Sequence, residues 1–167
     1  MKSEVKFRAW RRTDVARLAH LGPRLSPDSA HSRFWSGFNS IPPAYLRSIE
    51  ARWPEDWNAV VAIRDGEFVG WAEFGRNGHG SDDADLAVCV VDSERGKGTG
   101  SALIRALLTE SGRLGVHTMH ADLQPENTAA IRAWRNATRD FGSTLEFTPD
   151  GLRATVDLPV TSGRHAA

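Results

Sequence analysis

The stretch ADLAVCVVDSERGKGTGS, residues 84–101, decides how this chain folds. Its first part, 84–91, is an apolar run and is typical of a strand buried on both faces. Its second part, 95–100, is a turn with glycines at Gly96, Gly98 and Gly100. Helical spacing of leucine and isoleucine follows over 102–108 and stops at Gly112. The stretch therefore predicts a strand, a glycine-rich turn and a helix.

A turn of this kind is suited to holding a pyrophosphate. Several backbone N–H groups at a helix N-terminus have no partner within the helix, and the helix dipole is positive there. Glycines let the backbone approach a bulky anion closely. A P-loop is excluded because Gly98, and not serine or threonine, follows Lys97. The dinucleotide fingerprint is excluded because the glycine spacing is G-x-G-x-G.

The elements on either side of this stretch predict a mixed sheet. Strands are expected at 4–10, 58–64, 67–74, 84–91, 116–123, 144–148 and 152–158, and helices at 13–21, 26–38, 43–49, 102–112 and 127–141. Asp65-Gly66 predicts a hairpin, and the strand–helix–strand in the middle of the chain requires a parallel pair with a right-handed crossover. We expect an α/β (α+β) fold with helices on both faces of the sheet.

Length and composition set further limits. The 167 residues fit one domain, expected at 1–158 with a flexible tail at 159–167. The formal net charge of zero argues against a nucleic-acid partner, and the N-terminus lacks the apolar stretch of a signal peptide. No run approaches a membrane span, so a cytoplasmic location without membrane attachment is expected. A single cysteine, Cys89, and scattered histidines predict no metal site.

The pattern Arg95-x-x-Gly98-x-Gly100, in a strand–turn–helix, resembles the acetyl-CoA signature of the GNAT acetyltransferase superfamily. The order of elements from 4 to 158 is similar to that fold, and Asn127 opens the helix after the next strand. The resemblance implies a central mixed sheet of six to seven strands and acetyl-CoA as co-substrate, without a metal. It implies these cofactor-binding residues: Val88, Cys89, Val90, Arg95, Gly96, Lys97, Gly98, Thr99, Gly100, Ser101 and Asn127.

A second segment, LSPDSAHSRFW at residues 25–35, resembles bacterial Pat-type protein lysine acetyltransferases. This similarity implies direct acetyl transfer to a protein lysine, with Asp85 in the place of that branch's general-base glutamate. Asp85 is one methylene shorter, so it would act from on the order of 1.5 Å further away or through a water. Trp134 stands where many members have a tyrosine acid, so water would protonate the leaving thiol.

Several alternatives stay open at this point. The acceptor is a protein lysine or a small amine, such as an amino acid, a polyamine or an antibiotic. A weakly active acyl-CoA-binding regulatory module is the third reading. Asp85 is a base or a solvated carboxylate at a strand end, and Cys89 is a buried apolar residue or a nucleophile. Helices within 13–50 and the loop 149–151 are expected to flank the acceptor, with Arg33 as the ligand of an amino acid's carboxylate. Monomer and dimer are both compatible with the sequence.

Overall fold

The computed structural model describes residues 3–34 and 40–159 of the chain. Seven strands form one sheet in the order β1-β2-β3-β4-β5-β7-β6. In chain order the elements are β1 (Lys6–Ala9), α1 (Asp14–Ala19), the 3₁₀ turn η1 (Gly22–Arg24), α2 (Pro27–Phe34), α3 (Pro43–Glu50), β2 (Trp57–Arg64), β3 (Glu67–Arg76), β4 (Asp83–Val90), η2 (Asp92–Glu94), α4 (Thr99–Arg113), β5 (Thr118–Leu123), α5 (Thr128–Ala137), β6 (Ser143–Thr148) and β7 (Gly151–Asp157). The expected mixed sheet is confirmed.

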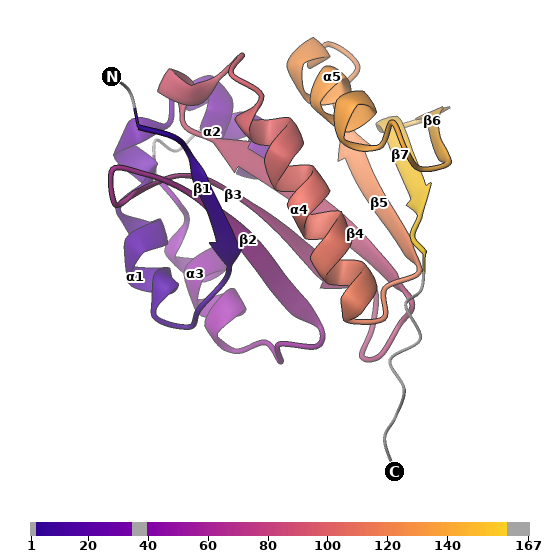
Figure 1. Ribbon diagram of the computed structural model, residues 1–167, viewed down its shortest axis with the longest axis horizontal. Helices are drawn as coiled ribbons and strands as arrows, with labels where there is room; N and C mark the ends of the chain where they lie inside the picture. Colours follow the sequence, from indigo (N-terminus) through magenta and orange to yellow (C-terminus); the bar gives the residue numbers. More distant parts are fainter. Residues whose placement is uncertain (1–2, 35–39, 160–167) are drawn as a thin grey trace.

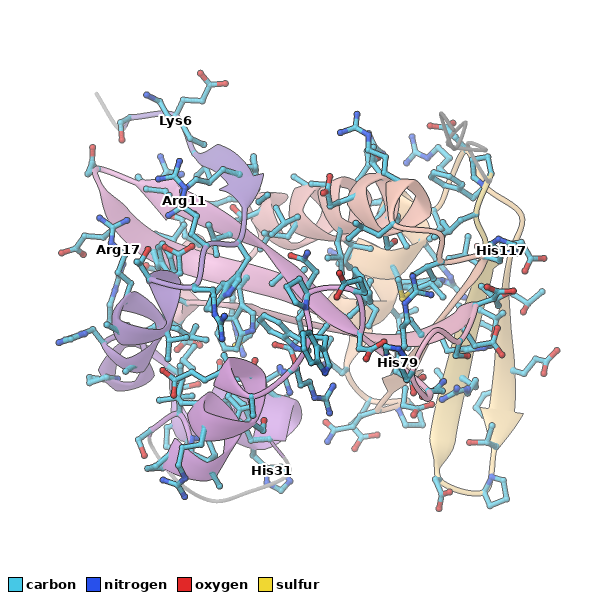
Figure 2. The ribbon with its side chains drawn as sticks, turned by 90° about the horizontal axis from the view of Figure 1, so that it is seen from below. Lys6, Arg11, Arg17, His31, His79 and His117 are labelled. Carbon is cyan, nitrogen blue, oxygen red and sulfur yellow. The ribbon has the colours of Figure 1, made fainter. Side chains whose placement is uncertain are left out.

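Helices cover both faces of this sheet. Helix α4 lies along one face with α5 beside it, and α1, α2 and α3 lie on the other face (Figure 1). Seen from below, the two layers are separated by the strands, with α4 above them and α2 and α3 beneath (Figure 2). The core is one continuous cluster of buried apolar side chains on the two sides of β2, β3 and β4. Within the apolar run that the sequence places in β4, Ala84, Leu86, Cys89 and Val91 are buried, whereas Ala87, Val88 and Val90 are only partly buried, so the strand is less covered than expected.

Local sequence signals account for most element boundaries. Asp65 and Gly66 both have positive φ, at 53° and 82°, as a two-residue hairpin turn requires. The Ser26 hydroxyl accepts a hydrogen bond from the Ser29 N–H at 3.2 Å, which caps α2 as predicted. Thr13 makes no such bond at the start of α1. Asp14, the first residue of the helix, accepts instead from the Arg11 N–H, which precedes the helix, at 2.8 Å.

The two central parallel strands pair only at their beginnings. Strand β4 is in register with β5 at Asp83↔Thr118, Ala84↔Met119 and Asp85↔His120, and the pairing ends there. Beyond Asp85 the two strands spread apart toward the turn that precedes α4 (Figure 1). Strand β7 then fits between β5 and β6. The separation leaves one side of the upper half of β4 without a neighbouring strand.

Candidate active site

The glycine-rich turn lies where β4 ends and α4 begins. Gly98 is the N-cap of α4 with a φ of 82°, and Gly96 has a φ of 73°. A Cβ built on either glycine would meet no atom within 4 Å, so the glycines face open space. The free N–H groups of the first turn of α4, which begins with Thr99, Gly100 and Ser101, lie at this position. The observation fits a cradle for a large anion.

A buried carboxylate supports the turn from behind. Glu94 in η2 is 4% exposed and accepts two hydrogen bonds from the Arg64 guanidinium, at 3.0 and 2.9 Å. The Lys97 ammonium lies 3.2 Å from the same carboxylate. Hydrogen bonding from Arg64 is the main reason that the pKa of Glu94 is lowered. Lys97 therefore directs its side chain toward Glu94, and only its backbone is left to serve a ligand in the turn.

Asp92, the first residue of η2, ties the turn to helix α2. Its carboxylate accepts from the Ser26 N–H at 2.6 Å and from the Ser29 hydroxyl at 2.8 Å. Arg95 lies beside it, with Nε 3.2 Å from the Asp92 carboxylate, and also donates to the Ser29 hydroxyl. Burial raises the pKa of Asp92, but the bonds from Ser29 and Ser26 outweigh burial and lower it. The glycine turn and α2 thus share one polar junction.

Beyond Asp85, every second residue of β4 directs its backbone N–H toward the gap between β4 and β5. The Val91 N–H donates to the Val69 carbonyl of β3 at 2.9 Å. Because successive backbone groups of a strand point to opposite sides, Cys89 also turns its N–H to β3, whereas Val88 and Val90 turn theirs toward β5. Pairing with β5 has ended by that point. The geometry fits the expectation that an extended ligand adds to this edge through Val88 and Val90.

Asp85 lies at the last paired position before the strands separate. Its Oδ1 accepts a hydrogen bond from the Arg153 Nη2 of β7 at 3.0 Å, and its side chain is 46% exposed. Arg153 also holds Asp122 of β5, with Nη1 2.8 and 2.9 Å from the two carboxylate oxygens. Hydrogen bonding to Asp122 is the main reason that the pKa of Arg153 is raised, so it stays charged. Asp85 is therefore a half-exposed carboxylate with one oxygen held by a cation.

A second carboxylate, Glu73 of β3, lies on the same face of the sheet. Glu73 is in register with Ala87 and Asp85 with Gly75, so both side chains project from one face. Glu73 is 8% exposed. It accepts hydrogen bonds from Arg33 of α2 at 2.6 Å, from Trp71 Nε1 at 2.9 Å and from the Tyr45 hydroxyl of α3. Glu73 is therefore held by three hydrogen bonds from side chains of α2, α3 and β3.

The groups around Glu73 correct one expectation. Burial opposes a charge on Arg33, but Glu73 raises its pKa and keeps the guanidinium charged. Arg33 is bound to Glu73 and stacks over the rings of Phe34 and Tyr45, 4.7 and 5.2 Å from their centres. Its Nη2 is held by Glu73 and its side chain is 12% exposed, which disfavours its predicted role as the ligand of an amino-acid carboxylate. Burial, together with Glu73, also raises the pKa of Tyr45 above its ordinary range, so Tyr45 is a poor acid.

Three other residues singled out from the sequence are buried in the core or cap a helix. Cys89 is buried, and burial raises the pKa of its thiol to about 12. Trp134 is 1% exposed and packs in the core. The Asn127 side chain accepts from the Ala130 N–H at 3.1 Å and caps α5. Phe34 of α2 stacks with Trp71 and lies edge-on to Tyr45, and Trp35 and Phe38 lie outside the described residues.

Sequence reasoning did not find Glu73, Arg153 and Asp122. Glu73 carried a usable signal, because it is the one charge within the apolar segment FVGWAEF at 68–74. A charge in a strand covered on both faces requires a buried partner. Arg153 and Asp122 carried no local signal. They meet because β7 pairs with β5 in the register Asp122↔Arg153, and sequence spacing does not reveal that register.

A seven-stranded mixed sheet that opens between β4 and β5, with an anion cradle at the start of α4, defines an acyl-CoA-dependent transferase fold. Residues 28–137 match the acetyltransferase (GNAT) family model, and the chain belongs to that family. A similar solved structure, of a protein from Salmonella typhimurium, contains its cofactor acetyl-CoA, with a TM-score of 0.70 and 24% identity over 99% of this chain and 98% of that one. The glycine turn and the free edge of β4 fit this co-substrate, which supplies an activated acetyl thioester. Within the described residues no group of three or more His, Cys, Asp or Glu side chains could hold a metal ion.

Solved structures similar to this chain include a GNAT domain and a spermidine acetyltransferase. The chain is similar to the GNAT domain of S. lividans PAT, with a TM-score of 0.81 and 23% identity over 92% of this chain and 90% of that one. It is similar to spermidine N-acetyltransferase from Vibrio cholerae, with a TM-score of 0.67 and 17% identity over 92% and 95% of the two chains. At these identities the likenesses show the fold.

One curated relative is closer in sequence over a shorter length. The chain is 35% identical over 101 residues to an L-2,4-diaminobutyric acid acetyltransferase from Nocardia farcinica. The match covers 58% of this chain and 52% of that protein, so it spans about half the length of the relative. Among the described residues, no helix is long and apolar enough to cross a membrane.

Proposed function

We propose that this acetyltransferase transfers acetyl to the ε-amine of a protein lysine. The observation that supports this acceptor is the charge at the opening between β4 and β5. Asp85 and Asp122 are two carboxylates that share Arg153, and these three side chains together carry a net charge of −1. Such a mouth attracts an alkylammonium group. Arg33, the cation expected to serve a free amino acid, is bound to Glu73.

The chemistry follows from the positions of these groups. The bound ammonium first loses a proton to solvent, and the neutral amine then attacks the thioester carbonyl carbon. The N–C bond forms, and the C–S bond breaks with the electron pair going to sulfur. Nitrogen loses basicity as its lone pair enters the new bond, so the Asp85 carboxylate can take its proton. The Val90 N–H faces the gap and is the donor for the developing oxyanion, because the Cys89 N–H points to β3. Water protonates the departing thiolate, whose pKa of about 8.5 makes it a tolerable leaving group.

We infer that the acceptor approaches between two parts of the fold, helices α2 and α3 on one side and the β6–β7 turn on the other. They project on the same side of the sheet, with β4 between them (Figure 2). An acceptor carried by a large protein needs such an approach, because the lysine must reach the opening while its own backbone stays outside. We assign the wall of this approach to α2 and α3 and to the loop 149–151.

A second acceptor is favoured by the diaminobutyric acid acetyltransferase relative. A free diamino acid presents the same ammonium group together with a carboxylate and a second amine. Asp85 and Asp122 would accept its cations, but its carboxylate would need a cation released from one of the ion pairs described above.

A thiol-release assay over a panel of acceptors tests the proposal. Acetyl-CoA is supplied with lysine-containing peptides, L-2,4-diaminobutyrate, spermidine and an aminoglycoside, and the acetylated product is identified by mass spectrometry. The proposal predicts a kcat/KM at least tenfold higher for a lysine peptide than for any small amine. A higher kcat/KM for L-2,4-diaminobutyrate than for a lysine peptide would show that the acceptor is a free diamino acid. Acetyl-CoA binding without thiol release on any amine identifies the regulatory module.

A further inference from the structure

The residue that links the two separating strands on the acceptor side is Arg153. It lies directly opposite Asp122 in the β5–β7 register, which explains its two-oxygen contact with that carboxylate. From there its second amino group, Nη2, crosses β5 and reaches Asp85 of β4 at 3.0 Å. We name these three side chains the carboxylate bridge. The bridge joins β4 to β5 and β7 at the point where their pairing stops.

We propose that Arg153 is a positioning residue for Asp85, an inference that rests on the proposed function. Arg153 holds Oδ1 of Asp85 and so turns the other carboxylate oxygen, Oδ2, toward the acceptor amine. An aspartate that is 46% exposed at a strand end would otherwise sample several rotamers. An arginine is needed because its two terminal nitrogens can bind two carboxylates at the same time. A lysine has a single charged nitrogen and cannot hold both in this geometry.

The bridge also explains how the short Asp85 works in place of a glutamate. A carboxylate that must reach the amine with one methylene less depends more on its orientation, since small misplacements of a catalytic group lower the rate by up to about hundredfold. Arg153 supplies that orientation. It does so without neutralising the site, because Asp122 balances its charge and the bridge keeps a net charge of −1.

This role predicts that kcat and KM respond differently to Arg153→Ala. Loss of the arginine frees Asp85 to rotate, so kcat falls roughly tenfold to hundredfold. The mouth then carries Asp85 and Asp122 alone, with a charge of −2, and a cationic acceptor binds at least as well, so KM does not rise. Arg153→Lys keeps a positive charge but loses the fork, and we expect it to recover only part of kcat.

The test is a double-mutant cycle between Arg153→Ala and Asp85→Asn. If Arg153 acts through Asp85, Arg153→Ala lowers kcat in the wild type and has no further effect in the Asp85→Asn background. Millimolar guanidinium should restore part of kcat to Arg153→Ala and none to the double variant. Acetyl-CoA affinity, measured by calorimetry, should stay within threefold throughout. Arg113→Ala, which removes the exposed ion pair with Glu110 at the end of α4, is the matched control and should behave as wild type.

Each outcome decides between the proposals. Equal loss of kcat in both backgrounds, or wild-type kcat in Arg153→Ala, overturns the positioning role and leaves the proposed function intact. A severalfold rise in KM with unchanged kcat also overturns it and makes Arg153 a ligand for an acceptor carboxylate. Wild-type turnover of Asp85→Asn shows that Asp85 is not the base, and then the assigned base and the positioning role both fail.

Discussion

Asp85 is the single side chain on which the proposed mechanism depends. It lies at the last paired residue of β4, half exposed, with one oxygen bound by Arg153. Asp85→Asn keeps the shape and removes the ability to accept a proton, so we expect kcat to fall by roughly 10²–10⁴ while acetyl-CoA affinity stays unchanged. Steady-state thiol release and calorimetry measure the two quantities.

The matched variant is Asp85→Glu, which places the carboxylate of the Pat-type branch at the same position. It should retain or raise turnover. A loss of less than about threefold in Asp85→Asn at saturating acceptor would assign proton removal to another group or to bulk water.

Cys89 provides a second test at the residue scale. Burial raises the pKa of its thiol to about 12, so the thiolate is absent at neutral pH and Cys89 cannot act as a nucleophile. We expect Cys89→Ala to keep kcat within threefold, and iodoacetamide to leave the folded protein unmodified at pH 7. An acetylated Cys89 peptide detected by mass spectrometry after incubation with acetyl-CoA alone would establish a two-step mechanism instead.

At the scale of elements, the turn into α4 holds the co-substrate. Gly98 and Gly115 lie at the two ends of α4 and share a φ of 82°. Asparagine tolerates this conformation, so Gly98→Asn and Gly115→Asn carry a similar backbone cost. Only the first places a side chain in the space of the pyrophosphate. We expect calorimetry to show at least a tenfold higher acetyl-CoA Kd for Gly98→Asn and no change for Gly115→Asn. Equal affinities in both variants would locate the cofactor elsewhere.

Helix α2 is joined to β3 by the buried pair Arg33–Glu73. The nitrogen and oxygen lie 2.6 Å apart, with side-chain exposures of 12% and 11%. Arg33→Ala leaves an uncompensated buried carboxylate and should lower the free energy of unfolding by about 3–5 kcal/mol. The double variant Arg33→Met/Glu73→Leu should recover most of that loss in urea unfolding. A double variant as unstable as Arg33→Ala would show that packing of the arginine stem is what matters.

For the whole molecule, several carboxylates predict sensitivity to acid. Asp14 and Asp92 have pKa values lowered by hydrogen bonds that outweigh burial, and Arg64 lowers the pKa of Glu94. A lowered pKa in the folded state gives stability that is complete above the unfolded values, about 4, and is lost as pH falls through the folded ones. We expect Tm to be nearly constant between pH 7 and 5 and to fall steeply below about pH 4.

Calorimetric scans across this pH range check the expectation, with Asp92→Asn as the variant. It should lower Tm at pH 7 by a few degrees, since it replaces the charge-assisted hydrogen bonds from Ser26 and Ser29 by neutral ones, at a cost of roughly 1 kcal/mol. The difference from wild type should shrink as pH falls through the lowered pKa of Asp92, because protonation removes the charge that accepts these hydrogen bonds. A difference that stays constant down to the acid transition would assign the effect to the side-chain shape and not to its charge.

The sequence by itself determined the class of fold and the cofactor cradle. Glycines at positive φ, a hairpin dipeptide and an apolar strand run are local signals, because each acts within a few residues of chain. These signals placed β4, the turn and α4, and through them the resemblance to acetyltransferases. They also placed Asp85 on a strand, but not beside a cation.

Only the tertiary structure decided how the polar residues meet. Arg153 reaches Asp85 because β7 inserts between β5 and β6, and Arg33 reaches Glu73 because α2 lies on that face of the sheet. These contacts join residues 68 and 40 positions apart, so no local pattern encodes them. Long-range strand order and register arise from burial of the whole core. Strand order and register decide which charged side chains pair, and so they decide the partner of Arg33 and the partner of Asp85.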